Sequence, residues 1–424
     1  MTTNTLFTAN NLDTWLAHLE QLHPNAIELG LGRITTVGER LNLIELDATV
    51  ITVAGTNGKG TTCAFLEQIL VDAGYKVGVY SSPHIHRYNE RLRINFKELS
   101  DQRHCDAFAM IEETRKDVSL SYFEYATLGC LYLLQQEKCD FILLEVGLGG
   151  RLDATNMVES DLSVVTTIGI DHIDWLGSDR EKIGFEKAGV FRANKPAICG
   201  DLDVPDSVIE HANNISAQLK LVNKDYRYER IEQDQWRWIG QKTLSPIKQT
   251  LMPIQNAATA LAVIESLDLD INAQRLIDSI EQASLAGRLQ PMTGYPCDVY
   301  IDVAHNPQSA EYLASQLQRI KTTKGESCKV HAVVGMLSDK DMTATLSAIN
   351  HKISDYRFVS LDCYRGASAD LLFEAYQKSE NNSHNVVKFL NVESAFEDAI
   401  KDADTSDIVI VFGSFHTVSD ILKK

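Results

Sequence analysis

A glycine-rich segment at residues 55–62, GTNGKGTT, has the composition of a loop that binds polyphosphate. It follows an apolar, β-branched run at residues 48–55 and precedes helical spacing over residues 59–73. Between a strand and a helix, successive backbone N–H groups and the helix N-terminus can surround phosphate oxygens. Glycine allows close approach and positive φ, and Lys59 can neutralise the outer phosphates. The pattern predicts a nucleotide-binding loop; the alternative is a glycine-rich turn with a surface lysine.

The loop differs from the common form G-x-x-x-x-G-K-[ST]. Gly60 follows the lysine, and the hydroxyl comes one place later, at Thr61. Thr61 either caps the helix or holds a metal ion, and the spacing leaves both roles open.

A second candidate group is a carboxylate, Glu145, at the end of the apolar run 141–146. The glycine-rich turn 147–150 and the polar residues of RLDATN follow it. Active-site groups of open α/β sheets lie at the carboxyl ends of strands, and Mg²⁺ prefers hard oxygen ligands. Beside a phosphate loop, we expect Glu145 to bind metal; the alternative is a helix N-cap or a solvated acid.

Further polar groups follow other predicted strands. His172 comes after the strand 162–168 and could bind a second metal, although a lone histidine is more often structural. Lys187 lies in a predicted helix at 180–190, where a snorkelling lysine or a salt bridge is the ordinary interpretation. Asp302 and His305 follow the strand 298–303 and could meet a ligand, whereas we expect Asn306 to cap the helix that begins at Pro307.

The alternation of strands and helices predicts the framework that positions these groups. It indicates βαβ units and a parallel sheet covered on both faces, and it restarts after the turn-rich stretch 286–294. We expect an α/β protein with two domains. Residues 1–286 should form the domain with the phosphate loop and a mostly parallel sheet, and residues 287–424 a smaller Rossmann-like domain that completes the ligand cleft. A small antiparallel sheet near 222–238 and helices at 254–267 and 271–283 are also predicted.

Composition narrows the classes of function. The 424 residues carry a formal charge of −18, which disfavours nucleic acid as a partner. The eight cysteines form no C-x-x-C pair and indicate buried thiols in a reducing compartment. No apolar run reaches membrane-spanning length, and the N-terminus lacks the pattern of a secretion signal. We therefore expect a cytoplasmic protein.

The motifs together resemble the folylpolyglutamate synthase/dihydrofolate synthase branch of the Mur-type ligase superfamily. The resemblance rests on GTNGKGTT, SSPHIHRYNERLRI, SYFEYATLG, EVGLGGRLDATN, IGIDHIDWLG with EKAGV, and DVAHNP, in the family's order and spacing over roughly residues 20–420. It implies an ATP-dependent ligase that adds L-glutamate to dihydropteroate and to folates through an acyl phosphate. It also implies ATP and two Mg²⁺ sites, allows for a monovalent cation, and favours a monomer whose partners are small molecules.

The resemblance also implies roles for individual residues. Metal ligands would be Ser82, Glu145, His172 and Lys187, the last as a carbamylated lysine whose carbamate supplies oxygen. Nucleotide contacts would come from Asn57, Gly58, Lys59, Gly60, Thr61, Asn256, Arg288 and Asp302. Lys59, Lys187, Asp302 and His305 would be catalytic. The dihydropteroate pocket would contain Ile27, Glu28, Leu29, Ser82, Phe123, Asp153 and Ala154. Phe123 could stack on a flat heterocycle, or simply pack in the core.

Two other functions compete with this one. A sibling ligase of cell-wall synthesis would share the phosphate loop and metal site but bind a nucleotide-linked sugar; the SPHIHRYNER and SYFEYATLG segments favour the pterin substrate. A nucleotide-dependent switch or motor would usually place Asp at the end of the second apolar strand, where this chain has Glu145. A ligase would show ATP turnover only with its co-substrates.

Overall fold

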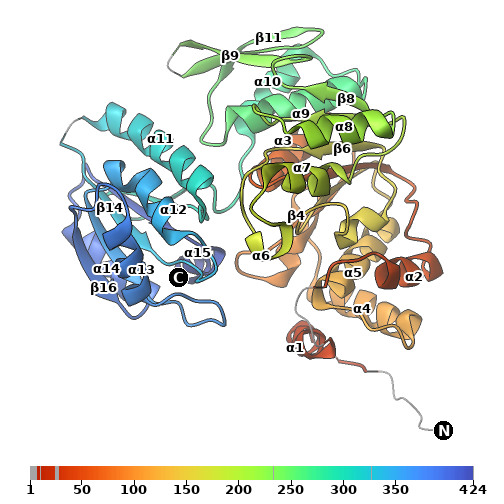
Figure 1. Ribbon diagram of the computed structural model, residues 1–424, viewed down its shortest axis with the longest axis horizontal. Helices are drawn as coiled ribbons and strands as arrows, with labels where there is room; N and C mark the ends of the chain where they lie inside the picture. The colour runs from red at the N-terminus through yellow and green to blue at the C-terminus, as the bar shows by residue number, and fades with distance from the viewer. Residues whose placement is uncertain (1–6, 10, 24–27, 233, 326, 424) are drawn as a thin grey trace. The chain divides into compact units, whose positions relative to one another are not determined.

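The computed structural model describes residues 7–9, 11–23, 28–232, 234–325 and 327–423 (Figure 1). The chain divides into two compact units, Met1–Ala283 and Ser284–Lys424. Strands alternate with helices in both units, which confirms the predicted α/β class.

An eight-stranded sheet forms the centre of the N-terminal unit, with strand order β4-β3-β2-β5-β1-β6-β7-β8. The six strands from β2 to β8 pair in parallel, and β3 and β4 add an antiparallel edge. β1 and β5 are buried along almost their whole length, as expected of β-branched and apolar runs covered on both faces. The strands are β1 (Thr49–Ala54), β2 (Val77–Tyr80), β3 (Leu92–Ile94), β4 (Lys97–Glu98), β5 (Phe141–Glu145), β6 (Leu162–Val165), β7 (Pro196–Cys199) and β8 (Gln218–Leu221).

Helices cover this sheet and enclose two apolar clusters. One cluster joins α1, α4 and α5 to β2 and β5, around Trp15, Phe108 and Tyr125; the other lies where α7 and α8 pack together. The helices are α1 (Leu12–Leu22), α2 (Gly32–Arg40), α3 (Lys59–Asp72), α4 (Asp101–Arg115), α5 (Tyr122–Glu137), α6 (Ile173–Leu176), α7 (Arg180–Ala188), α8 (Asp206–Asn214), α9 (Ile254–Ser266) and α10 (Ala273–Gln282), with 3₁₀ turns η1 (Tyr88–Arg91) and η2 (Ala154–Met157).

A separate three-stranded antiparallel sheet belongs to the same unit. Its order is β11-β10-β9, with β9 (Arg227–Glu232), β10 (Gln235–Ile239) and β11 (Thr243–Lys248). The buried Trp236 and Trp238 face the core from β10, and Trp238 Nε1 donates to the Ala258 carbonyl of α9 at 3.1 Å. The predicted antiparallel sheet is thus confirmed, but it extends ten residues beyond the predicted end at 238.

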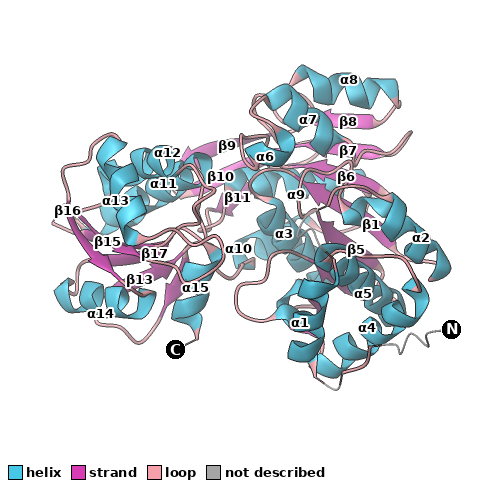
Figure 2. Cartoon of the chain, turned by 60° about the horizontal axis from the view of Figure 1, so that its bottom comes forward, coloured by secondary structure: helices cyan, strands magenta, loops and turns pink. Residues whose placement is uncertain are grey.

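The C-terminal unit has its own six-stranded sheet, of order β12-β13-β17-β14-β15-β16, parallel except at β12. Figure 2 labels β13, β15, β16 and β17 of this sheet. The strands are β12 (Gln290–Met292), β13 (Asp298–Ile301), β14 (Val330–Val334), β15 (Asp355–Val359), β16 (Asn385–Phe389) and β17 (Ile408–Phe412). The helical segments are α11 (Pro307–Lys324), α12 (Met342–Ile349), η3 (Asn350–Lys352), α13 (Ala369–Lys378), α14 (Val392–Asp402) and α15 (Phe415–Leu422). A smaller doubly wound domain is what the sequence predicts.

Two expectations from composition can be compared with the structure. All eight cysteines are free, and all but Cys363 are buried, which confirms the prediction of buried thiols. Within the described ranges, no helix combines the length and apolar character needed to cross a bilayer.

Candidate active site

Four neighbouring parallel strands of the large sheet bring the predicted site residues to one edge. The order β2-β5-β1-β6 has Tyr80 paired with Leu144, Glu145 with Val53, and Ala54 with Val165. Ser82, Glu145, the phosphate loop and residues 166–172 therefore all lie at or just beyond the carboxyl ends of adjacent strands, where open α/β sheets bind ligands.

The phosphate loop adopts a conformation that only glycine allows at two positions. Gly55 has φ 148° and Gly58 has φ 91°. A Cβ atom on Gly55 would lie 1.9 Å from Thr166 Oγ1, and one on Gly58 would lie 2.6 Å from Asn256 Oδ1. α3 begins at Lys59, directly after Gly58. The first N–H groups of a helix have no partner within it, so the loop presents donors suited to an anion.

Two threonines after β6 hold this loop in place. The Thr56 N–H donates to the Thr167 carbonyl at 2.7 Å, and the Asn57 N–H donates to Thr167 Oγ1 at 3.1 Å. Thr166 Oγ1 donates to the Asn57 carbonyl at 2.6 Å. These bonds span more than a hundred residues of sequence, and a role for Thr166 and Thr167 was not predicted from the sequence.

Lys59, Thr61 and Asn256 complete the loop. Lys59 Nζ donates to the carbonyls of Gly55 at 3.0 Å and Thr56 at 3.3 Å, so the ammonium lies over its own loop. Thr61 Oγ1 donates to the Gly58 carbonyl at 3.0 Å and accepts from Asn256 Nδ2 at 2.5 Å. The N-cap of α3 is Gly58, so the capping role considered for Thr61 is wrong. Its hydroxyl instead ties the loop to α9, and this bond places Asn256 beside the loop.

Glu145 is buried, with 7% of its surface exposed, so the alternative of a solvated acid is wrong. Burial, followed by the charge of Glu145, raises the pKa of the Cys63 thiol, so the carboxylate is electrostatically coupled to α3. Ser82, two residues beyond β2, is partly buried. A carboxylate and a hydroxyl at neighbouring strand ends are oxygen donors of the kind that Mg²⁺ selects.

Lys187 is the most unusual cation of the site. It is 3% exposed, and no ion pair with a described residue reaches its ammonium group, so the snorkelling and salt-bridge interpretations are wrong. Burial, followed by the positive charge of Lys59, lowers its pKa from 10.5 to about 7, against the opposing influence of Asp171 and Asp153. The electrostatic coupling groups Lys187 with the phosphate loop. A lysine that is half neutral at pH 7 can act as a nucleophile.

The segment that carries His172 is clamped from both sides. Arg180, the first residue of α7, donates from Nε to the Ile168 carbonyl at 3.0 Å, and the Ile168 N–H donates to Asp201 Oδ2 at 2.5 Å. Arg180 Nη2 also lies 3.3 Å from Asp201 Oδ1. His172 has φ 52° and a side chain that is 38% exposed. The clamp therefore connects the loop after β6 to the helix that carries Lys187.

The glycine-rich turn after β5 is built around Asp153. One carboxylate oxygen accepts from the N–H groups of Gly147 at 3.1 Å and Leu148 at 2.9 Å, and the other accepts from the Thr155 N–H and Oγ1. Burial raises the Asp153 pKa, and these bonds oppose the rise. The turn packs on α7, where a Cβ atom on Gly150 would lie 2.8 Å from the Glu186 carbonyl. Asp153 thus shapes the turn, and the buried Ala154 follows it at the start of η2.

The residues predicted to bind the pterin come from three separated segments. Glu28 pairs with Arg33, and Arg33 Nη2 lies 3.1 Å from Glu124 Oε1, which itself caps α5 together with Ser121. The Gly30 N–H, directly after Leu29, donates to the Leu152 carbonyl at 3.3 Å. These contacts join residues 28–33 to the turn at 152–154 and to the start of α5. Ile27 lies outside the described residues.

Phe123 lies at the start of α5, next to the glycine-rich turn. Its ring packs against the large apolar cluster, and a Cβ atom on Gly147 would lie 2.5 Å from its Cζ. The half-buried ring therefore packs in the core and also borders the turn that contains Asp153 and Ala154.

In the C-terminal unit, Asp302 and His305 follow β13. The Asp302 carboxylate accepts from the N–H groups of Leu289 and Ala304, both at 2.7 Å, and burial raises its pKa while Arg288 opposes the rise. The His305 ring donates from Nδ1 to the Val303 carbonyl at 2.8 Å, which fixes the tautomer with the lone pair on Nε2.

Phe415, which was not predicted as a site residue, lies near two side chains of the C-terminal unit, Arg288 and His305. Its ring centroid is 5.5 Å from the Arg288 guanidinium and 6.5 Å from the His305 ring. The sequence indicates Phe415 only weakly, through its position just after the apolar strand β17 and at the start of a helix. Asn306 caps α11 by accepting from the Ser309 N–H at 3.0 Å, as predicted.

Two observations bear on other sites. Within the described part of the chain, no three His, Cys, Asp or Glu side chains gather in a way that could hold a metal by themselves.

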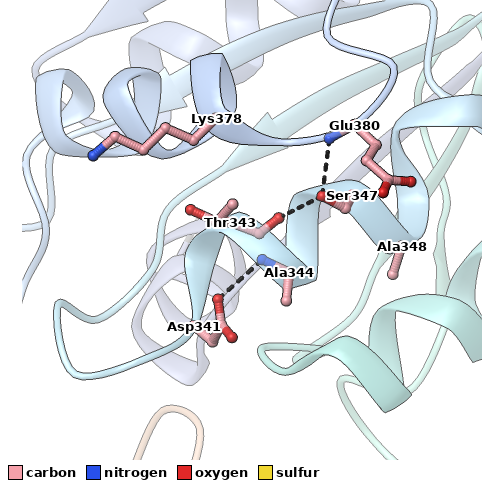
Figure 3. Close-up of a pocket in the computed structure, with 7 residues that line it drawn as sticks. All are labelled: Asp341, Thr343, Ala344, Ser347, Ala348, Lys378 and Glu380. Atoms are coloured by element: carbon pink, nitrogen blue, oxygen red, sulfur yellow. Dashed lines mark hydrogen bonds between the residues drawn. The ribbon is translucent and has the colours of Figure 1, made fainter.

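A surface pocket of the C-terminal unit, between α12 and the end of α13, contains none of the predicted site residues (Figure 3). Its lining is Asp341, Thr343, Ala344, Ser347, Ala348, Lys378 and Glu380.

Comparison with known proteins places the chain in a family. Residues 53–264 match the Mur ligase middle domain, and residues 287–415 match the Mur ligase glutamate ligase domain. The dihydrofolate synthase/folylpolyglutamate synthase of Escherichia coli strain K12 is 44% identical over 98% of this chain and 96% of its own length.

Solved structures agree with this assignment. E. coli FolC in complex with DHPP and ADP has a TM-score of 0.92 and 44% identity, covering 98% of this chain and 97% of that one. The bifunctional folylpolyglutamate synthase/dihydrofolate synthase from Yersinia pestis, complexed with AMPPNP and Mn ion, has a TM-score of 0.91 and 46% identity, covering 99% of each chain. These full-length matches leave no support for a cell-wall ligase or a nucleotide-dependent motor. The chain belongs to the dihydrofolate synthase/folylpolyglutamate synthase family of Mur ligases.

Proposed function

We propose that this chain, an ATP-dependent glutamate ligase of folate metabolism, catalyses two reactions. It adds L-glutamate to dihydropteroate to give dihydrofolate, and it adds further glutamate to folates. The observation that carries the proposal is the edge of four strands where the phosphate loop, Glu145, Ser82 and the segment before His172 come together, with Lys187 coupled to them. Relatives that match almost the whole chain bear both activities in their names.

The chemistry explains why such a site is needed. A carboxylate does not react with an amine at neutral pH, because oxide is a poor leaving group. Transfer of the γ-phosphoryl group to the carboxylate gives an acyl phosphate, from which phosphate leaves when the amine of glutamate attacks. The carboxylate and the triphosphate repel each other, so the site must supply positive charge.

We assign nucleotide binding in the N-terminal unit to Asn57, Gly58, Lys59, Gly60, Thr61 and Asn256. The N–H groups at the start of α3 would bind the phosphate oxygens, and Lys59 can extend from its loop carbonyls to the outer phosphates. Asn256 supports the loop through Thr61.

The metal assignment rests on donor chemistry. Ser82, Glu145, His172 and, once carbamylated, Lys187 are the proposed ligands. Glu145 and Ser82 supply oxygen donors that fit Mg²⁺, because this ion commonly takes one or two protein carboxylates and completes its shell with phosphates and water. When bound, the metal offsets the repulsion between the two anionic substrates. Two Mg²⁺ sites are proposed; a monovalent cation stays a prediction.

Lys187 is proposed to be carbamylated. A neutral amine attacks CO₂ and loses a proton, which leaves a carbamate with two oxygens. The lowered pKa gives the amine the required neutral fraction at pH 7, whereas an ordinary lysine is almost fully protonated. The carbamate would turn a buried cation into an oxygen ligand.

Substrate contacts are proposed for Glu28, Leu29, Phe123, Asp153 and Ala154, together with Ile27. The hydrogen bonds between residues 28–33, the turn 147–154 and the start of α5 support a shared pocket. Phe123 would stack on the pteridine, and Asp153 would act by holding the turn.

For the C-terminal unit we propose nucleotide contacts from Arg288 and Asp302. His305 would lie near the transferred phosphate or the incoming amine. Its Nε2 carries the lone pair and can accept a hydrogen bond. Asp302 interacts electrostatically with Arg288 and His305, and the Phe415 ring lies beside the Arg288 guanidinium. We also propose that the N-terminal functional domain ends at residue 286 and that the C-terminal domain begins at residue 287.

We propose that the chain acts as a monomer on small molecules. Its charge of −18 disfavours nucleic acid as a partner. Eight free cysteines support a reducing compartment, which for this enzyme is the cytoplasm.

A paired-substrate assay tests the function. ADP release is coupled to NADH oxidation and measured with dihydropteroate or tetrahydrofolate, each with and without L-glutamate. We expect glutamate-dependent ADP release with both acceptors and little without them. Release that needs neither acceptor nor glutamate would contradict the proposal, and activity with one acceptor alone would restrict it to a single reaction.

A further inference from the structure

Arg91 is a buried cation that the proposed mechanism does not use. It is 7% exposed, and its guanidinium donates from Nε to His84 Nδ1 at 2.9 Å. The rings of Tyr88 and Tyr122 lie 5.7 and 5.6 Å from it. No carboxylate among the described residues pairs with it, and its Nη atoms make no hydrogen bond to a described residue.

A second deeply buried arginine shows how such a charge is usually balanced. Arg357, at 3% exposure, pairs with Asp355, Asp398 and Asp402. A guanidinium without a counter-ion is costly to bury, and two aromatic faces offset only part of that cost. The Nη atoms of Arg91 are not among the described side-chain atoms that are buried and lack a hydrogen-bond partner. Because they make no hydrogen bond to a described residue, they must retain access to solvent. These features point to an anionic ligand.

The surroundings of Arg91 relate it to the substrate site. The Ser81 N–H donates to the Arg91 carbonyl at 2.9 Å, and Ser81 directly precedes the proposed metal ligand Ser82. Tyr122, whose ring faces the guanidinium, directly precedes Phe123. Arg91 is therefore adjacent both to the segment assigned to the metal and to the segment assigned to the pteridine.

We propose that Arg91 binds the α-carboxylate of a glutamyl unit, and specifically that of the folate tail. The inference rests on the proposed function. Dihydropteroate has one carboxylate, which must react. A folate has an α-carboxylate that must stay unreacted beside the γ-carboxylate that receives the phosphoryl group. An arginine fork can hold the first in two parallel hydrogen bonds and leave the second at the reaction centre.

Steady-state kinetics of Arg91→Gln and Arg91→Lys test the proposal with both acceptors. Loss of a charge-assisted hydrogen bond should raise the KM for tetrahydrofolate about 10- to 100-fold in Arg91→Gln. The KM for dihydropteroate should stay close to that of the unaltered enzyme, and Arg91→Lys should recover part of the loss. The ratio of kcat/KM for the two acceptors does not depend on the folded fraction, so partial misfolding cannot produce the effect.

Arg87→Gln is the matched control, because Arg87 is an exposed arginine of the same loop that pairs with Asp101 and Glu98. A KM increase for L-glutamate in both reactions, with the folate KM unchanged, would assign the bound α-carboxylate to the incoming amino acid. Equal KM values for Arg91→Gln and the unaltered enzyme, or equal losses with both acceptors, would overturn the proposal. Failure of the proposed function itself is distinct, because the unaltered enzyme would then lack glutamate-dependent ADP release.

Discussion

Replacing Lys187 by methionine should abolish ligation and at the same time stabilise the nucleotide-free protein. The side chain is 3% exposed, and burial, followed by the charge of Lys59, lowers its pKa from 10.5 to about 7. In the unfolded chain the ordinary value applies. The difference, 10.5 − 7 = 3.5, corresponds to about 5 kcal/mol of folding free energy at 1.36 kcal/mol per pKa unit. Methionine has similar length and carries no charge to desolvate.

The sign and the pH range follow from linkage. Below about pH 7 the lysine is protonated in both states, and the whole cost opposes folding. Above that pH the folded protein gives up the proton, the cost shrinks as pH rises, and it vanishes near pH 10.5, where the unfolded lysine also deprotonates. The stabilisation by Lys187→Met should therefore be greatest at neutral or lower pH and decline steadily toward pH 10.

Differential scanning calorimetry in CO₂-free buffer between pH 6 and 10 would measure the effect, on the transition that MgADP shifts. At about 2 °C per kcal/mol for a unit of this size, the increase in Tm should reach up to about 10 °C. Lys182→Met is the matched control, because Lys182 is an exposed lysine of the same helix, and its Tm should barely change. A Tm gain that does not vary with pH, or a loss of stability, would refute the reasoning.

Three further substitutions probe other parts of the site. Glu145→Gln should abolish glutamate-dependent ADP release without lowering Tm, because it keeps the shape of a buried side chain but removes the charge; near-normal turnover would contradict the metal assignment. Arg180→Leu should raise the KM for MgATP about tenfold and leave the KM for dihydropteroate unchanged, since it releases the Ile168 clamp; equal effects on both would indicate general damage. Phe123→Leu should raise the KM for both pteridine acceptors about tenfold with the KM for ATP unchanged, and an altered ATP value instead would argue against stacking.

The positions of Glu145 and the phosphate loop in the fold could be predicted because each lies at the end of an apolar strand. Glu145 and the phosphate loop each follow an apolar run that the sequence shows directly, and the parallel order of β5, β1 and β6 then brings their ends to one edge. The central strands were predicted within a few residues for the same reason. By contrast, β3, β4, β7 and β8, which lie at or next to the two edges of the sheet, were not predicted, because such short strands lack a distinctive pattern.

The supporting contacts could not be predicted from the sequence. The bonds from Thr167 to Asn57 and from Asn256 to Thr61 join residues 110 and 195 positions apart, and no local spacing reveals such pairs. Arg180 and Asp201 look like ordinary surface charges in the sequence. Only the folded arrangement shows that they hold both backbone groups of Ile168.

The two lysines of the site explain each other. The charge of Lys59 lowers the pKa of Lys187, so as ammonium groups they oppose one another in a buried environment. On the proposal that Lys187 carries a carbamate, the same proximity becomes attractive, because a buried anion is then coupled to Lys59 and to any bound metal. The charge of Lys59, which destabilises the ammonium, therefore favours the modified form. In a chain of net charge −18, this local balance matters more for binding two anionic substrates than the overall charge does.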